Sequence, residues 1–269
     1  PYHLIHSAAM SVRAQARKML LQWVMSHLRR AAHLIADSEF TKSELLAFTD
    51  YPEERISVVP LGADHLAFEP LVESQLVAFK QRIQIPLSSS FILHVGSCDE
   101  RKNIPNLLRA FAATRKQLGD DLYLVQIGGK FTSDQWTLIH QLGIEHRVKQ
   151  VRNMSANELA CAYQACDLLV LPSTYEGFGL PVLEAMAAGK PVVALRAGAL
   201  TELVGDAGVL VEVNDPYEIA RAVLAILSSV RLREHLSQKA KQRAALFTWR
   251  RTASETLAIY HRIAQASAR

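Results

Sequence analysis

Cysteine is scarce in this sequence, which has three in 269 residues. Cys98, Cys161 and Cys166 form no Cys-x-x-Cys pair and have no histidine at zinc spacing. We therefore expect neither a disulfide framework nor a zinc knuckle, and a reducing, cytoplasmic location fits best.

Long apolar runs are missing as well. Basic residues interrupt the most hydrophobic segment, so no run of about 18 apolar residues predicts a membrane-spanning helix. In residues 11–30 apolar side chains recur at helical spacing with basic residues between them, which predicts an amphipathic helix. That helix either packs on neighbouring protein or lies on an anionic membrane surface, so a peripheral position at the inner face of a membrane stays open.

The common signatures for nucleotides and metals are also lacking. The sequence has no Gly-x-Gly-x-x-Gly fingerprint, and Pro191 follows Gly189 and Lys190 where a Walker loop would continue. These absences exclude the usual dehydrogenase and P-loop classes. No Asp-x-Asp motif is present to hold a divalent cation, so we expect no metal site and no cofactor.

The net charge is +4 and the isoelectric point is near 9.0, which favours anionic partners. The basic residues are interleaved with acidic ones, so we do not expect nucleic acid as a partner. With 49% hydrophobic and 21% charged residues, the composition is that of a folded protein with one dominant domain.

From Phe91 onward, short apolar runs alternate with helical stretches, which predicts an α/β fold with a doubly wound parallel sheet. The strands are nearly continuous in hydrophobicity, as expected for a sheet covered on both faces. The expected strands are Phe91–Val95, Leu122–Ile127, Val148–Val151, Leu168–Leu171, Val192–Ala194 and Val209–Val211. Residues 216–265 are expected to be helical throughout.

The N-terminal part has a different pattern. His33–Ala36 and Ile56–Val59 are expected strands, and Ser38 is the expected cap of a helix that ends near Phe48. Residues 61–70 have turn chemistry without periodicity, which predicts an interdomain linker. Because the chain starts at Pro1 with no recognisable first strand, we expect it to be part of a longer protein.

In a doubly wound sheet, ligands bind at the carboxyl ends of the strands. After the first expected strand, Gly96 begins a turn that leads to Arg101, Lys102 and Asn103. We expect Asn103 to cap the next helix, and two cations beside a helix N-terminus favour a phosphate. The alternative is a solvated pair of cations on a loop.

After the second strand come Gly128, Gly129 and Lys130. Glycine there lets a ligand approach the backbone closely, and a plain turn is the alternative.

The third segment, Tyr175 to Gly189, is the most informative. Gly177 and Gly179 predict a tight turn, and Pro181 predicts the start of a helix that ends near Gly189.

Two carboxylates lie in that segment. Glu184 is the lone charge on an apolar helix, and an unpaired buried carboxylate is costly, so it needs a partner. Ligand hydroxyls would provide one, and a fixed arginine or backbone donor is the alternative. Glu176 lies in the turn, where it either faces a ligand or is exposed.

The pattern Tyr-Glu-Gly-Phe-Gly-Leu-Pro-x-x-Glu-Ala-Met-Ala-x-Gly resembles the signature of the family 4 retaining glycosyltransferases of GT-B fold. The resemblance covers the chain from about Ala32 to its end. Further matching pieces are Val95-Gly96 through Asn103, Ala165 to Asp167, Pro172-Ser173, Gly198 to Glu202, and Phe247 to Trp249.

The resemblance implies a donor site for a nucleoside diphosphate sugar. Glu184 would accept the ribose hydroxyls, and Glu176 would lie beside the transferred sugar. Arg101 and Lys102 would stabilise the departing diphosphate, a role that fits the missing metal motif. The catalytic residues implied are thus Arg101, Lys102 and Glu176.

Backbone groups complete the implied donor site. Gly177, Phe178 and Gly179 would donate to sugar hydroxyls, and the helix start at Leu180, Pro181 and Val182 would face the diphosphate. Gly96 and Gly128 end the strands beneath it. Many relatives have an arginine where this chain has Ser97, and the Arg-Lys-Asn form slightly favours a GDP-mannose donor.

The resemblance also implies a domain plan and an activity. Residues 1–60 would be the remnant of an N-terminal acceptor domain, 61–70 the linker, and 71–269 the Rossmann-like donor-binding domain with the C-terminal helices. The implied reaction is metal-independent transfer of a hexose, with retention, to a glycan or lipid-linked acceptor in polysaccharide biosynthesis. We expect these residues alone to be weakly active or inactive. Alternatives are a non-catalytic sugar-nucleotide-binding module, a GT-B epimerase and a purely structural module.

Overall fold

The computed structural model describes residues 19–20, 23–63 and 71–267 of the chain. Half of the residues in which the amphipathic helix was expected, 11–30, and most of the expected linker lie outside these residues; of the described part, residues 19–20 and 23–27 are helical. The chain divides into two compact units, one formed by Pro1–Leu61 with Arg250–Arg269 and the other by Gly62–Trp249. Residues 250–269 therefore group with the N-terminal segment, whereas they were expected in the C-terminal domain.

The first unit is small. Its elements in the described residues are η1 (Leu28–Arg30), β1 (Leu34–Ala36), α3 (Glu39–Phe48), η2 (Glu53–Arg55), β2 (Ile56–Val58) and most of α12 (Trp249–Ser267). The strands β1 and β2 pair in parallel. Ser38 caps α3, because its hydroxyl oxygen accepts a hydrogen bond from the Thr41 N–H at 2.9 Å. Both strands and the cap are confirmed, each strand one residue shorter than expected.

The second unit contains a six-stranded parallel sheet with the order β5-β4-β3-β6-β7-β8. The strands are β3 (Ser90–Gly96), β4 (Leu122–Gly128), β5 (Val148–Val151), β6 (Leu168–Leu171), β7 (Val192–Leu195) and β8 (Val209–Val211). All six expected strands are present. Each residue of β6 is at most 1% exposed, which explains why its sequence is apolar without alternation.

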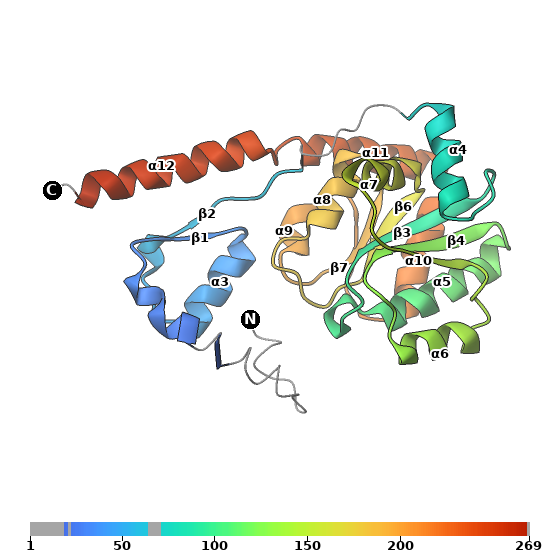
Figure 1. Ribbon diagram of the computed structural model, residues 1–269, viewed down its shortest axis with the longest axis horizontal. Helices are drawn as coiled ribbons and strands as arrows, with labels where there is room; N and C mark the ends of the chain where they lie inside the picture. Colours follow the sequence, from blue (N-terminus) through green and yellow to red (C-terminus); the bar gives the residue numbers. More distant parts are fainter. Residues whose placement is uncertain (1–18, 21–22, 64–70, 268–269) are drawn as a thin grey trace. The chain divides into compact units, whose positions relative to one another are not determined.

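Helices cover both faces of this sheet (Figure 1). They are α4 (Glu73–Arg82), η3 (Glu100–Lys102), α5 (Ile104–Leu118), α6 (Ser133–Gln141), α7 (Ala156–Ala165), α8 (Leu180–Ala187), α9 (Leu200–Val204), α10 (Pro216–Ser228) and α11 (Val230–Ala244). The helix α10 packs against α5, and α11 packs against α8. The predicted α/β fold with a parallel sheet is confirmed. Residues 216–265 are not one continuous helical stretch, because α10, α11 and α12 are separated by short breaks.

The sheet order fixes where a ligand can bind. The chain runs outward from β3 through β4 to β5, returns to β6 beside β3, and continues outward through β7 to β8. The strands β3 and β6 are thus neighbours from which the chain departs in opposite directions, and this switch point is where open α/β sheets bind ligands. Among the described helices, none combines the length and apolar content that a bilayer crossing requires.

Candidate functional site

Two loops meet at the switch point, one after β3 and one after β6. The Thr174 N–H donates to the Arg101 carbonyl oxygen at 2.9 Å. The Asn103 side-chain amide donates to the Pro172 carbonyl oxygen at 3.0 Å and to the Asn214 side-chain oxygen at 2.7 Å. Asn103 is the N-cap residue of α5 by position but makes no side-chain capping bond, so its predicted capping role is wrong. Its amide joins the loops instead.

A buried ion pair lies between these loops. Lys102 is 4% exposed and Glu176 is 7% exposed, and Lys102 Nζ lies 2.5 Å from Glu176 Oε1. Arg101 Nη1 lies 3.1 Å from Glu176 Oε2. The alternatives of an exposed Glu176 and a solvated Lys102 are therefore wrong. Two cations share one carboxylate, and the group keeps a net charge of about +1 that suits an anionic ligand.

Glycines lie at the ends of β3 and β4, next to Lys102. Gly96 and Gly128 are in register at the ends of β3 and β4. A Cβ on Gly128 would lie 2.8 Å from the Gly96 oxygen, and one on Gly129 would lie 2.4 Å from the Cys98 nitrogen. The Gly129 N–H donates to the Gly96 carbonyl oxygen at 2.8 Å. Glycine is thus required here by the close approach of the protein's own backbone, which neither alternative in the sequence analysis had identified.

The second carboxylate, Glu184, is 7% exposed on α8. One hydrogen bond to it comes from Tyr163 of α7, whose hydroxyl donates to Glu184 Oε2 at 2.6 Å. Burial first, and the carboxylate second, raise the pKa of Tyr163 well above its ordinary value. Sequence reasoning expected a ligand, an arginine or the backbone and missed this tyrosine. The sequence did contain a signal for Tyr163. It stands three residues after Ala160, so both lie on the same, buried side of the helix.

The turn before α8 has the expected form but offers fewer donors than expected. Gly179 is the N-cap at φ +101°, where a Cβ would also lie 2.6 Å from Leu200. Pro181 has no N–H, and the Val182 N–H donates to the Gly179 oxygen at 2.9 Å. Of the three residues at the predicted helix start, Leu180 therefore keeps an N–H without a partner among the described residues.

Phe178 and Ser97 occupy supporting positions. Phe178 is 7% exposed, and its ring packs edge-on against Phe247 with centroids 6.2 Å apart, so it anchors the turn. Ser97 donates from its hydroxyl to Asp99 at 2.8 Å. Arg101 is directed at Glu176 and Tyr175.

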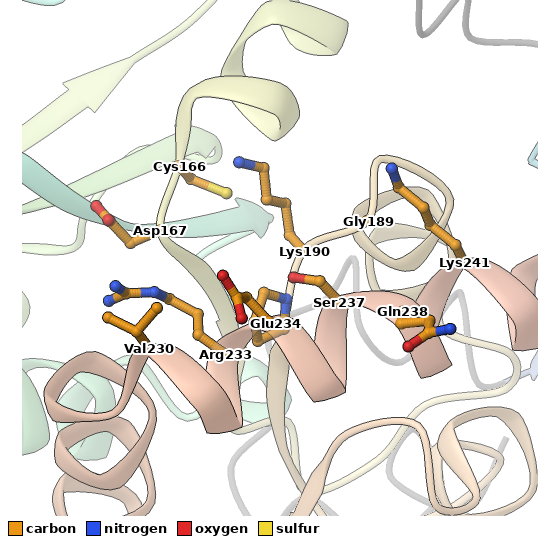
Figure 2. Close-up of a pocket in the computed structure, with 11 residues that line it drawn as sticks. Cys166, Asp167, Gly189, Lys190, Val230, Arg233, Glu234, Ser237, Gln238 and Lys241 are labelled. Atoms are coloured by element: carbon orange, nitrogen blue, oxygen red, sulfur yellow. The ribbon is translucent and has the colours of Figure 1, made fainter.

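Two hollows lie outside this group. One of about 710 Å³ opens beside Ser97, Gly129 and Lys130 at the carboxyl ends of β3 and β4. The other, of about 590 Å³, is lined by Asp167, Lys190 and α11 side chains such as Arg233 and Glu234 (Figure 2). Asp167 precedes β6 and Lys190 precedes β7. The second hollow therefore lies at the amino ends of the strands, opposite the carboxyl ends where the ion pair lies. Among the residues that the structure describes, no group of three His, Cys, Asp or Glu side chains is arranged to hold a metal ion.

Known proteins resemble this chain over most of its length. Residues 78–243 match the family described as glycosyl transferases group 1. The chain is 30% identical over 237 residues to an O-antigen chain mannosyltransferase B of Escherichia coli, covering 87% of this chain and 61% of that protein. It is 34% identical over 245 residues to a D-inositol 3-phosphate glycosyltransferase of Salinispora arenicola, covering 86% and 54%. The chain therefore spans less than two thirds of the length of these curated relatives.

Solved structures show the same fold. A sucrose-phosphate synthase from Thermosynechococcus elongatus superposes with a TM-score of 0.76 at 25% identity, covering 96% of this chain and 65% of that one. The Anabaena protein HepE, solved with UDP and glucose, superposes with a TM-score of 0.76 at 22% identity, covering 93% and 67%. These structural neighbours are GT-B glycosyltransferases, so the predicted fold class is confirmed.

Proposed function

Because the chain belongs to the group 1 glycosyltransferases, we propose that it transfers a hexose from a nucleoside diphosphate sugar to an acceptor hydroxyl with retention and without a metal ion. The observation that carries the proposal is the pairing of Arg101 and Lys102 with Glu176 at the switch point of the sheet. Two cations at this position support a role in stabilising a departing diphosphate, because electrostatic stabilisation of a leaving group is often a large catalytic contribution.

Each site residue has a role in the proposal. Glu184, held by Tyr163, accepts the ribose hydroxyls of the donor. The Phe178, Gly179 and Leu180 N–H groups face the sugar and the diphosphate. Glu176 lies beside the transferred sugar.

Retention is proposed to occur on one face of the sugar. The bond from the anomeric carbon to the phosphate oxygen breaks, the new bond to the acceptor oxygen forms on the same side, and the departing phosphate takes the acceptor proton. Both oxygens of Glu176 are engaged by cations, which makes that carboxylate a poor nucleophile. We therefore assign Glu176 to positioning rather than to covalent catalysis.

Mannose is the favoured sugar, with support from the mannosyltransferase relative and the Arg-Lys-Asn loop. A glycan or lipid-linked acceptor and a cytoplasmic location, either free or at the membrane surface, are part of the same proposal. So is the activity of the whole protein, because the chain spans 61% and 54% of the two curated relatives.

A thermal-shift screen with GDP-mannose, UDP-glucose and ADP-glucose tests the donor site. A ligand at about 100 times its Kd stabilises the native state by about 2.7 kcal/mol, which raises Tm by about 5–10 °C for a domain of this size. We expect GDP-mannose to give the largest shift. No shift with any of the three would contradict the proposed donor site.

The variant Lys102→Ala tests the leaving-group role. If Lys102 acts mainly in the transition state, turnover should fall much more than donor affinity. Transfer is measured with the natural polypeptide that carries these residues, and Lys116→Ala is the control because Lys116 is exposed near the C-terminal end of α5. Normal turnover in Lys102→Ala would exclude the role.

A further inference from the structure

His94 is an exception among the buried polar side chains of the sheet. It is 0% exposed in β3, and neither ring nitrogen has a hydrogen-bond partner among the described residues. Its registered neighbours are satisfied: Gln126 donates to the Gly96 oxygen at 3.0 Å, and Gln150 donates to the Gln126 side-chain oxygen at 3.2 Å. An unpaired buried polar group destabilises a fold, so the presence of a histidine at position 94 needs an explanation.

The ammonium of Lys102 lies beside Gly96, two residues after His94 in β3. Residues two apart in a strand direct their side chains to the same face, so Gly96 marks the next side-chain position beyond His94. A Cβ on Gly96 would lie 3.3 Å from Lys102 Nζ, which places the ammonium at that position. The ammonium has three N–H donors, and Glu176 is its one hydrogen-bond acceptor among the described residues.

The two groups are chemically complementary. Burial first, and the nearby Lys102 charge second, lower the pKa of His94 to about 3. The imidazole is therefore neutral near pH 7 and keeps one nitrogen lone pair that can accept a hydrogen bond.

We propose that the neutral imidazole of His94 is the second hydrogen-bond acceptor of the Lys102 ammonium, reached through one buried water in the empty site and, directly or through that water, when Lys102 turns from Glu176 to a phosphate. His94 is then a positioning residue. A carboxylate partner neutralises the ammonium, whereas an imidazole partner solvates it and leaves its full charge for the ligand. The link between His94 and Lys102 stands on its own, and its effect on nucleotide binding rests on the proposed function.

Nuclear magnetic resonance tests the link without a ligand. The ring-nitrogen resonances of His94 are assigned as those lost in His94→Gln. We expect them to have the neutral pattern between about pH 5 and 8 and to move in Lys102→Met but not in the matched control Lys130→Met. Ring-nitrogen chemical shifts of His94 that are unchanged in Lys102→Met would overturn the proposal.

Binding of GDP and UDP tests the consequence. We expect His94→Leu to weaken binding about tenfold, the factor that corresponds to one hydrogen bond to a charged group. His94→Asn supplies a polar atom near Nδ1 and His94→Gln supplies one near Nε2, so one of the two should restore affinity and identify the nitrogen. His146→Leu is the control, because the side chain of His146 is 93% exposed.

A double-mutant cycle separates positioning from packing. In a Lys102→Met background, His94→Leu should have no further effect on affinity, because the ammonium it serves is gone. An equal loss in both backgrounds, or wild-type affinity in a folded His94→Leu variant, would refute the proposal. If His94→Leu does not fold, the Asn and Gln variants and the resonances decide. If the wild-type chain binds neither GDP nor UDP, the proposed function fails while the resonance test still decides the role of His94.

Discussion

Replacing Tyr163 with phenylalanine should destabilise the second unit by a measurable amount. The substitution keeps the ring, which is 0% exposed, and removes the hydroxyl that donates to Glu184 Oε2 at 2.6 Å. A hydrogen bond to a charged group contributes roughly 1.5–3 kcal/mol, so we expect a loss of about 2 kcal/mol. For a domain of about 150–250 residues this corresponds to a decrease in Tm of about 4–8 °C.

The assay is thermal unfolding followed by circular dichroism, with nucleotide affinity measured on the same variants. The control is Tyr217→Phe, because Tyr217 is 73% exposed and its change should stay within about 0.5 kcal/mol. If Glu184 accepts ribose hydroxyls, loss of the tyrosine that fixes it should also weaken nucleotide binding by about three- to tenfold. A Tyr163→Phe variant with wild-type Tm and wild-type affinity would refute the assigned role of this pair.

Two other substitutions give separate tests. Between its unfolded pKa of 6.5 and about pH 4.5, His94 takes up a proton only in the unfolded chain, so acidification over this range should lower the free energy of unfolding by about 2 kcal/mol. Urea unfolding at both pH values checks this, and the His94→Gln variant should lack that part of the pH dependence. Gly129→Ala would place a Cβ 2.4 Å from the Cys98 backbone nitrogen, so we expect a Tm lower by several degrees and weaker nucleotide binding; unchanged values of both would show that the loop relaxes freely.

Much of the second unit could be predicted from local pattern. The apolar runs that became β3, β4, β6 and β7 are strands buried on both faces, and burial of that kind leaves a direct mark in the sequence. Ser38 likewise marks the start of α3, because a cap uses chemistry that is local in the chain.

The contacts within the site could not be predicted in the same way. The positions of Lys102 and Glu176 after their strands were visible, but their pairing depends on β3 and β6 being neighbours, and strand order leaves no periodic signal. The bond from Tyr163 to Glu184 crosses from α7 to α8 and depends on how the two helices pack. At Asn103 the local pattern gave a wrong prediction. Asparagine is typical of helix caps, but here its side-chain amide donates to Pro172 and Asn214, which are distant in the sequence.

The sharing of Glu176 between Arg101 and Lys102 has a consequence for selectivity among anions. A small anion without hydroxyl donors, such as sulfate, must draw Lys102 away from a contact of 2.5 Å and offers Glu176 no hydrogen bond in exchange. A nucleotide sugar, under the proposed function, brings hydroxyl donors for the carboxylate together with phosphates for the cations. Under the proposed function, the ion pair therefore favours a nucleotide sugar, which satisfies both the carboxylate and the cations, over an anion that satisfies the cations alone.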